Sequence, residues 1–346
     1  MTKEEFVAQL DRAGATLSGL PVTTAMVQWL AEALRKGDPP WWTATLKAWE
    51  KRKFVAWTEA WGLFLTAVHF EVLSDAANPL VPYFPSCEGT DEGDPSGALA
   101  EFLKNPPPSF YENLKLGHRR VYVEARAGMW IWPALLFFQR RNLPFYLVEV
   151  NAGAGLNLAA DVVAPQKQFN SGLVEARIGL DQESLELENM AHRRWLTAAI
   201  MPDQVPLIQP LDNAMEEVLE RRRRNENFIQ LVEMKPELAA KFIAKNVPAD
   251  DEDVGLMLFN MGATARMTDK EYEAYANGIS QMMLPWGNRA LWIEFESVRG
   301  ELFSMTYQLR VHRLVGGQLG QHVMASFDFG ASKTVFNGEE SAKFLA

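Results

Sequence analysis

Hydrophobic residues in the first part of the chain recur with the spacing of a helix. Over residues 1 to about 75, apolar positions lie three and four residues apart, which places them on one helical face. This stripe could line a ligand cavity, but a packed core is the commoner use, and we expect core. His69 ends the stripe and is expected to be a hydrogen-bonded core residue. The stripe consists of Trp42, Leu46, Trp49, Phe54, Trp57, Trp61, Phe64, Leu65 and Val68.

After Pro144 the pattern changes to short apolar runs separated by helical stretches. Alternation of this kind predicts an α/β protein whose parallel sheet is covered on both faces. Two later runs, 305–314 and 322–329, flank Gly316-Gly317 and predict a terminal antiparallel hairpin. The four predicted parallel strands are 145–150, 176–181, 254–260 and 289–296.

The segment between these two parts is rich in proline and glycine. Residues 76–109 predict a long loop region with a short helix near 98–103, and a helix follows at 125–139. Pro133 either kinks that helix or belongs to its first turn. We therefore divide the chain into an N-terminal helical subdomain, 1–124, and an α/β domain, 125–346.

Composition narrows the functional class. The 346 residues are 48% hydrophobic and 23% charged, as in ordinary soluble proteins, and carry a net charge of -10. That charge repels phosphate backbones, so a nucleic-acid partner is not expected. The basic run Arg221 to Arg224 follows Glu216, Glu217 and Glu220 and is expected to be the solvated end of a helix.

The cysteine and histidine content and the hydropathy of the chain argue against a disulfide-bonded, metal-binding, secreted or membrane protein. One cysteine, Cys87, allows no internal disulfide, and five scattered histidines show no metal-ligand spacing, so no metal is expected. The start of the chain lacks the pattern of a signal peptide, and the longest apolar run, Met129 to Phe138, is too short to span a bilayer. We expect a cytoplasmic protein without a membrane partner. The sequence does not indicate its oligomeric state.

The candidate chemistry lies in the stretch FYLVEVNAGAGLNLAADVV, residues 145–163, which predicts strand, tight turn and helix. A P-loop requires Gly-Lys-Ser/Thr, which neither this stretch nor GASKT at 330–334 contains. A dinucleotide fingerprint requires a third glycine after Gly153 and Gly155, where the chain has Leu158. We expect Leu158 to hold the helix away from the strand, and we do not expect a nicotinamide enzyme.

A third loop, that of S-adenosylmethionine-dependent methyltransferases, matches best. Its pattern is an acidic residue followed by three alternating glycines, and the chain has Glu149 followed by Asn151, Gly153 and Gly155, with Ala152 between them. Asparagine tolerates a left-handed backbone, so the turn can form with Asn151 in the first glycine position. The cofactor carries no phosphate, so the loop needs no lysine.

Further polar residues follow the other predicted strands. Asp181, with Gln182 beside it, ends the second strand, where a carboxylate can bind both ribose hydroxyls; alternatively Asp181 caps its helix. The proline-containing run 205–211 is expected to be the edge strand, which places Asp212 and Asn213 near the adenine. Asn260 ends the strand predicted at 254–260 and is expected opposite the sulfonium of the cofactor.

Several of these motifs resemble one known family, the uncharacterised bacterial family called domain of unknown function 2332. The resemblance runs from about residue 60 to the end of the chain. It implies a doubly wound, Rossmann-like methyltransferase fold and S-adenosylmethionine as cofactor, but no established reaction. Compared with the family, Asn151 replaces a glycine, Asn260 a histidine, and Glu124-Ala125 an Asn-Glu pair. The landmarks are TAVHFEVL, NPLVPYFPS, RRVYVEARAG, LVEVNAGAGLNL, IGLDQESLELENMAHRRWLTAAIMP and ASFDFG.

Two functions from different classes remain open. The first is a transferase that methylates a small acceptor, in which Glu149 orients the cofactor's amino group and the N-terminal helices cover the site. Tyr122, Glu124 and Asn260 are then candidates for contacts with the acceptor, although Glu124 could equally form a surface ion pair with Arg119, Arg120 or Arg126. The second is a non-catalytic binding or scaffold protein built on a degenerate methyltransferase fold, which the altered loop would explain.

Overall fold

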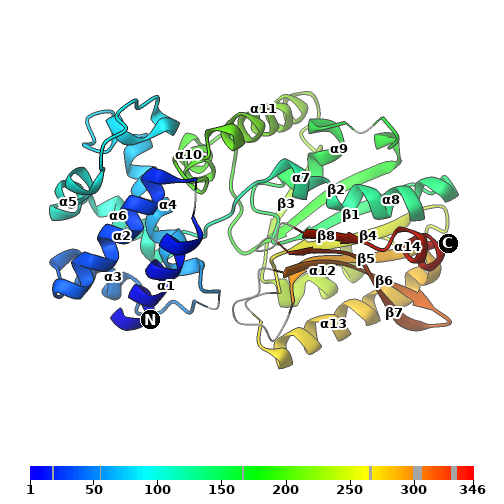
Figure 1. Ribbon diagram of the computed structural model, residues 1–346. Coiled ribbons are helices and arrows are strands. Elements are labelled where there is room, and N and C mark those ends of the chain that lie inside the picture. Colours follow the sequence, from blue (N-terminus) through cyan, green and yellow to red (C-terminus); the bar gives the residue numbers. More distant parts are fainter. Residues whose placement is uncertain (18, 55, 166, 265–266, 299–305, 329–332) are drawn as a thin grey trace. The chain divides into compact units, whose positions relative to one another are not determined.

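The computed structural model describes residues 1–346 except 18, 55, 166, 265–266, 299–305 and 329–332 (Figure 1). The chain forms two compact units. The first unit comprises 1–122 and 189–212, and the second comprises 123–188 and 213–346. The expected division fell once, after residue 124, whereas the helical unit also includes 189–212, which follow the second strand.

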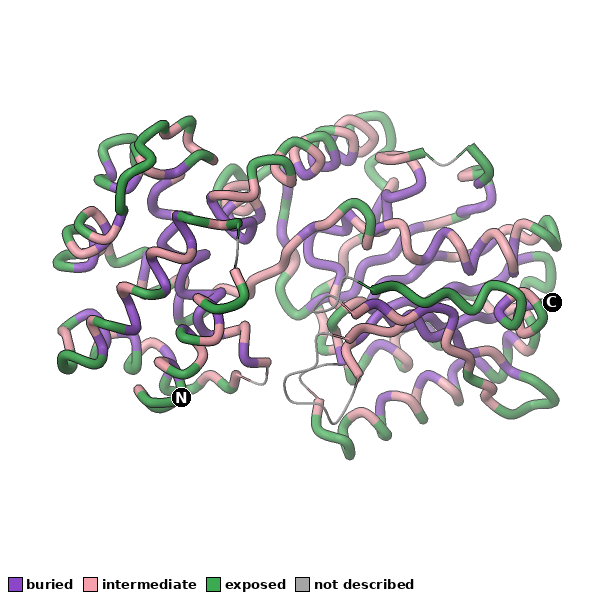
Figure 2. Tube along the Cα trace, viewed as in Figure 1, coloured by how far each residue is buried: buried purple, intermediate pink, exposed green. Residues whose placement is uncertain are grey.

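The first unit is helical, and its aromatic stripe forms the core (Figure 2). Trp42, Trp49, Trp61 and Phe64 are buried, and the ring of Phe6 stacks on Trp42 with 5.1 Å between centroids. The predicted use of the stripe as core is confirmed for these residues but is wrong for Leu46, which is exposed. The helices are α1 (Lys3–Thr16), α2 (Pro21–Lys36), α3 (Pro40–Ala48), α4 (Glu59–Ser74), α5 (Ser96–Lys104), α6 (Pro108–Leu116) and α10 (Met190–Ala198), with 3-10 turns η1 (Val81–Tyr83), η2 (Pro85–Cys87) and η7 (Val205–Leu207).

The second unit contains an eight-stranded mixed sheet with the order β3-β2-β1-β4-β5-β6-β7-β8. The first five strands of this order are parallel, and the remaining three pair antiparallel. The terminal hairpin is confirmed, because β6 and β7 meet at Gly316-Gly317, both with positive φ. The strands are β1 (Phe145–Val150), β2 (Val174–Asp181), β3 (Gln230–Glu233), β4 (Gly255–Met261), β5 (Ala290–Ser297), β6 (Thr306–Val315), β7 (Gln318–Asp328) and β8 (Lys333–Phe336).

The expected edge strand at 205–211 is wrong. These residues form η7 and the start of α11 (Ile208–Arg224), and the parallel edge strand is β3, about twenty residues later. The two prolines explain the error. Pro206 and Pro210 lie in the first turns of η7 and α11, where a missing N–H leaves no helical hydrogen bond unmade.

Helices cover both faces of the sheet, as the alternating pattern predicted (Figure 1). One face, including Val148, Leu258 and Trp292, packs on α12 and α13. On the other face, Trp130 contacts Phe145 and Phe259, each with 6.4 Å between ring centroids. The helices, apart from α11, are α7 (Glu124–Ala127), α8 (Ile131–Phe137), α9 (Ala160–Val163), α12 (Ala239–Asn246), α13 (Asp269–Met283) and α14 (Gly338–Leu345).

The helix expected at 125–139 is broken into α7, a 3-10 turn η3 (Gly128–Trp130) and α8. Pro133 is the third residue of α8, so it belongs to the first turn, which was one of the two expected positions. The other 3-10 segments of this unit are η4 (Gln139–Arg141), η5 (Leu156–Ala159), η6 (Ser171–Leu173), η8 (Pro236–Leu238) and η9 (Leu284–Arg289).

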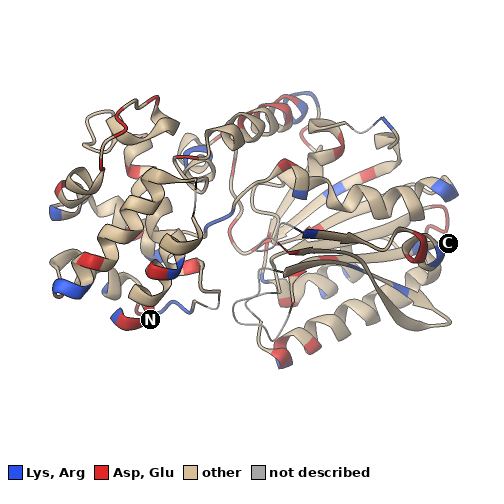
Figure 3. Cartoon of the chain, in the orientation of Figure 1, with Lys and Arg blue, Asp and Glu red and all other residues tan. Residues whose placement is uncertain are grey.

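The basic run at the end of α11 is paired with acidic residues (Figure 3). Arg221 Nε lies 2.7 Å from Glu217 Oε1, and Arg224 Nη2 lies 2.8 Å from Glu220 Oε1. The prediction of a solvated helix end is therefore confirmed. Within the described part of the chain, every helix is too short or too polar to traverse a lipid bilayer.

Candidate functional site

The sheet changes direction between β1 and β4. From β1 the chain proceeds outward to β2 and β3 on one side, and from β4 to β5 on the other. The carboxyl ends of β1 and β4 therefore lead to loops that turn away from each other, and open α/β sheets bind ligands at this point. The residues after these ends define the candidate site.

The loop after β1 uses three left-handed residues in alternation. Asn151, Gly153 and Gly155 have φ angles of 72°, 57° and 76°. Asparagine thus occupies the conformation that glycine adopts without strain, as its tolerance of this region predicted. The alternating pattern of the sequence is consequently a geometric feature of the loop, with Asn151 serving as its first member.

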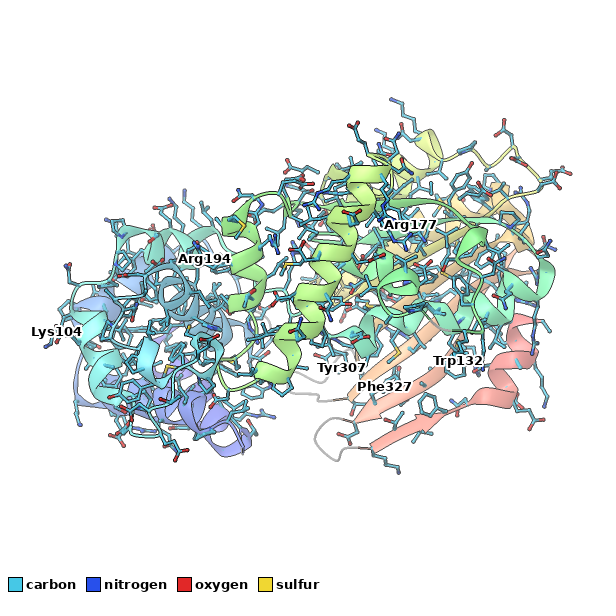
Figure 4. All side chains as sticks on the ribbon, turned by 90° about the horizontal axis from the view of Figure 1, so that it is seen from above. Lys104, Trp132, Arg177, Arg194, Tyr307 and Phe327 are labelled. Atoms are coloured by element: carbon cyan, nitrogen blue, oxygen red, sulfur yellow. The ribbon has the colours of Figure 1, made fainter. Side chains whose placement is uncertain are left out.

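Glu149 lies at the base of this loop and is fully buried. Its Oε1 accepts a hydrogen bond of 2.7 Å from Asn157 Nδ2, and the carbonyl of Asn157 accepts one of 2.9 Å from Trp130 Nε1. The carboxylate therefore holds the chain segment that follows the loop. Arg177 of β2, labelled in Figure 4, lies on the same face and forms a buried ion pair with Asp161 at 2.7 Å.

Asp181 anchors the loop from the neighbouring strand. Its Oδ2 accepts a hydrogen bond of 2.7 Å from the Gly153 amide, and its Oδ1 accepts one of 2.9 Å from the Glu183 amide. The alternative that Asp181 caps the following helix is wrong, because α10 begins only at Met190. The carboxylate instead joins the two loops at the ends of β1 and β2.

A glycine on β2 explains how Leu158 is accommodated. A Cβ added to Gly179 would lie 2.8 Å from Ala152 Cβ and 3.3 Å from Leu158 Cδ1. The close contact that the dinucleotide fingerprint obtains from its third glycine is thus made here through Gly179. Leu158 itself is fully buried and lies in η5, a 3-10 segment. Leu158 therefore packs against β2 at Gly179, and the expectation that its side chain holds the helix away from the strand stays a prediction.

The glycine loop is covered by the segment after β2. The Leu185 amide donates a 3.3 Å hydrogen bond to the Gly153 carbonyl, and Leu185 is buried. Ala152, Ala154 and Leu156 are buried as well, whereas Gln182 is exposed. The loop is therefore packed on the protein's own chain along much of its length.

Asp212 and Asn213 do not lie at the end of a strand. Both belong to α11, so the expected position beside an adenine at the sheet edge is wrong. The residue that ends the true edge strand is Glu233, which is in register with Asp181. The sequence signal for β3 is the short apolar run that precedes Glu233.

Asn260 lies on the opposite face of the sheet from Glu149, because Asn260 pairs with Val150 whereas Glu149 pairs with Phe259. It is fully buried. Its Nδ2 donates to Glu296 Oε1 at 2.6 Å, and its Oδ1 accepts from Trp292 Nε1 at 2.8 Å. The Asn260 side chain thus bonds to β5, although Asn151 Nδ2 of the loop after β1 lies 3.5 Å from the carbonyl of the neighbouring Met261.

Sequence reasoning missed a buried polar cluster on β5 and β6. Glu294 Oε2 accepts hydrogen bonds from His312 Nε2 at 2.8 Å and from Tyr272 Oη at 2.9 Å, and Arg310 Nε lies 3.5 Å away. Burial by itself raises the pKa of Glu294, but His312 and Arg310 outweigh burial and lower that pKa. The signal was WIEFES, in which the acidic residues fall on alternate positions of an apolar strand.

Glu296 anchors the loop after β4. Its Oε1 accepts hydrogen bonds from the amides of Ala263 at 2.9 Å and Thr264 at 3.2 Å, in addition to Asn260. Burial, together with the charge of Glu294, raises the pKa of Glu296 to about 7. This carboxyl group therefore changes its charge near neutral pH.

The other two acceptor candidates, Tyr122 and Glu124, lie on either side of the chain boundary between the units. Tyr122 is the last residue of the first segment of the helical unit and is buried, whereas Glu124 begins α7 and is exposed. Residues 330–332 of the rejected GASKT segment lie outside the described residues. No group of three or more histidine, cysteine, aspartate or glutamate residues in the described chain could hold a metal ion.

Comparison with known proteins gives a family but no activity. No curated protein matches the chain. The family model of domain of unknown function 2332, described as an uncharacterized protein conserved in bacteria, matches residues 9–168 and 161–332. These two matches together include nearly the whole helical unit and most of the sheet. The chain therefore belongs to the bacterial family called domain of unknown function 2332.

Proposed function

We propose that this protein binds S-adenosylmethionine at the carboxyl ends of β1 and β2 and transfers its methyl group to a small acceptor. The observation that carries the proposal is the loop directly after Glu149, in which Asn151, Gly153 and Gly155 are left-handed. Gly153 and Gly155 have no Cβ, so at these two positions the backbone can approach a ligand closely. The absence of a lysine from this loop suits a cofactor that carries no phosphate.

The strand order supports a methyltransferase-like form of the fold. The parallel order β3-β2-β1-β4-β5 is that of doubly wound nucleotide-binding sheets, and reversed strands follow β5. In such sheets the acid after the second strand faces the first loop, which is the position of Asp181. Asp181 also anchors this loop through its hydrogen bonds from the Gly153 and Glu183 amides, which places its carboxylate beside the loop that would hold the cofactor.

In this proposal the protein acts mainly by positioning. Methyl transfer is an in-line displacement at carbon, in which the acceptor replaces the sulfur, so alignment of donor and acceptor supplies most of the acceleration. Glu149 would orient the cofactor's amino group, directly or through water. Glu124 and Tyr122 remain the candidates for contacts with the acceptor.

A second candidate is a non-catalytic protein that retains this sheet. Burial of Ala152, Ala154 and Leu156 favours it, as does the use of both Asp181 oxygens by backbone amides. The loop would then serve only to connect β1 with η5.

Calorimetric titration with S-adenosylmethionine and with its demethylated product separates the two candidates. We expect saturable binding to the wild-type protein, weakened by about 1–3 kcal/mol in Asp181→Ala, because ribose hydroxyls would lose their acceptor. Glu175→Ala is the matched control, since Glu175 is an exposed acid on the same strand. If neither compound binds the folded wild-type protein, the non-catalytic candidate is the better one.

A further inference from the structure

A serine and a histidine form a hydrogen-bonded pair in the helical unit, separate from the loop after β1. His69 lies on α4 and Ser86 in η2, and His69 Nε2 lies 2.8 Å from Ser86 Oγ. His69 is buried, with 1% of its surface exposed, whereas Ser86 is half-buried between the exposed residues Pro85 and Glu88. The serine is therefore the member of the pair nearer to solvent.

The other ring nitrogen of His69 fixes which of the two residues donates. His69 Nδ1 lies 2.9 Å from the Ile200 carbonyl and 3.2 Å from the Ala198 carbonyl. Carbonyl oxygens only accept, so Nδ1 carries the hydrogen. Burial lowers the pKa of His69 to about 4, so the ring is neutral at pH 7. Its Nε2 lone pair then faces Ser86, and the Ser86 hydroxyl donates to it.

We propose that Ser86 is a nucleophile that attacks activated carboxylic esters. His69 is the base that accepts the proton of the Ser86 hydroxyl. A nucleophile within hydrogen-bond reach of a base, with the base oriented by a third group, is the arrangement that nucleophilic catalysis requires. Here the carbonyls of Ile200 and Ala198 are the third group. Ser74 offers a contrast on the same helix, because its hydroxyl donates to the Phe70 carbonyl at 2.6 Å and so is not directed at a base.

The reaction proceeds in two balanced steps. Ser86 Oγ forms a bond to the ester carbonyl carbon while its proton moves to His69 Nε2, and the bond to the leaving alkoxide then breaks as that alkoxide takes the proton. Water attacks the resulting acyl-serine by the same route, which releases the carboxylic acid and restores the Ser86 hydroxyl.

Two other titratable groups lie near the pair. Cys87 Sγ lies 3.9 Å from Ser86 Oγ, and burial raises the pKa of this thiol, so the thiol stays protonated at neutral pH. The charge of Asp203 acts to raise the pKa of His69, but burial outweighs it. The Asp203 carboxylate itself accepts hydrogen bonds from the amides of Val22 and Thr23, both at 2.9 Å.

A fluorophosphonate probe tests the proposal on the full chain. Attack by Ser86 forms a P–O bond and expels fluoride, and mass spectrometry of the intact protein and its peptides locates the adduct. We expect one adduct, at Ser86, that is absent in Ser86→Ala and unchanged in Ser96→Ala, a half-buried serine of the same unit. His69→Asn should slow labelling by about 100-fold or more.

A pH series on the wild-type protein needs no substitution at a buried residue. Since His69 is already neutral, the labelling rate should stay level from pH 6 to 9, whereas attack driven by hydroxide would rise about tenfold per pH unit. No adduct in the folded wild-type protein, or an adduct on Cys87 in place of Ser86, would overturn the proposal. A labelling rate that rises with hydroxide would overturn the role of His69 as base.

Discussion

Two buried carboxylates at the same edge of the sheet perform the same task in different surroundings. Asp181 on β2 accepts a hydrogen bond from the loop after β1, and Glu296 on β5 accepts hydrogen bonds from the loop after β4. Each strand beside the point where the sheet reverses therefore has its loop held by an acid from the next strand outward. These are the two loops that follow the strand ends at which the sheet changes direction.

The difference lies two residues earlier on each strand. Asp181 is preceded on its face by Gly179, whereas Glu296 is preceded by the buried acid Glu294. Burial raises the pKa of Glu296 to about 7, and the negative charge of Glu294 adds to this rise. The carboxyl group that anchors the loop after β4 therefore changes its charge near neutral pH, and the neighbouring Glu294 contributes to that property.

The largest effect is expected at Glu294. Glu294→Ala should lower the free energy of unfolding by about 3–5 kcal/mol, because it leaves Arg310 and His312 buried without their carboxylate. Urea denaturation at pH 7 measures the change. Glu175→Ala, at an exposed position, should change stability by less than about 0.5 kcal/mol. A similarly small change in Glu294→Ala would mean that the cluster is not held by its charges.

A pH series on Glu296→Gln tests the contrast directly. Between pH 4.5 and 7, folded Glu296 retains a proton that the unfolded chain has released, so its contribution to stability falls as pH rises through this window. The difference between the pKa of Glu296 and that of an ordinary glutamate corresponds to roughly 3 kcal/mol of folding free energy. The free energy of unfolding of the variant, relative to that of the wild-type protein, should therefore rise by about that amount from pH 4.5 to 7.5.

Only the difference between variant and wild type is informative in that series. His69, whose pKa burial lowers to about 4, contributes an opposite slope between pH 4 and 6.5, and this slope cancels when the two proteins are compared. Melts by circular dichroism at each pH supply the comparison. A difference that stays constant with pH would show that Glu296 is ionised throughout.

Asp181→Ala should lower the free energy of unfolding by about 2 kcal/mol, because it leaves the buried Gly153 amide without an acceptor. This loss of unfolding free energy follows from removing the hydrogen bond that holds the loop after β1. Thermal melts, with Gln182→Ala as a control at the exposed neighbouring position, measure it. Equal stability of both variants would mean that the loop after β1 needs no anchor.

The smallest effect is expected at Asn151. Asn151→Gly should change stability by less than about 1 kcal/mol, since relief of a left-handed non-glycine residue offsets the greater freedom of the unfolded chain. It should tighten S-adenosylmethionine binding by removing a Cβ from the ligand's path. Asn151→Ala is the matched control and should be the less stable variant at this φ. Clear destabilisation of Asn151→Gly without binding would favour the non-catalytic candidate.

Sequence reasoning located the elements whose signals are local. The run 145–150 and the Gly316-Gly317 hairpin were predicted because residues close together in the sequence determine apolar strands and left-handed turns. The third strand was missed because prolines at 206 and 210 suit an edge strand and a first helical turn equally well. The spacing of the two acids on β5 was visible, but their partners His312 and Arg310 come from another strand and no local pattern pairs them.

The helical unit is built from two separate chain segments, which affects how it folds during synthesis. His69 binds carbonyls 129 and 131 residues further along the chain, so its core contacts cannot form until β1 and β2 have been made. A nascent chain that ends at residue 122 lacks α10 and η7 of the unit and exposes the surface that α10 covers. The helical unit begins first, but it cannot complete its core until the chain has been made to residue 212, and closing so long a loop is slow.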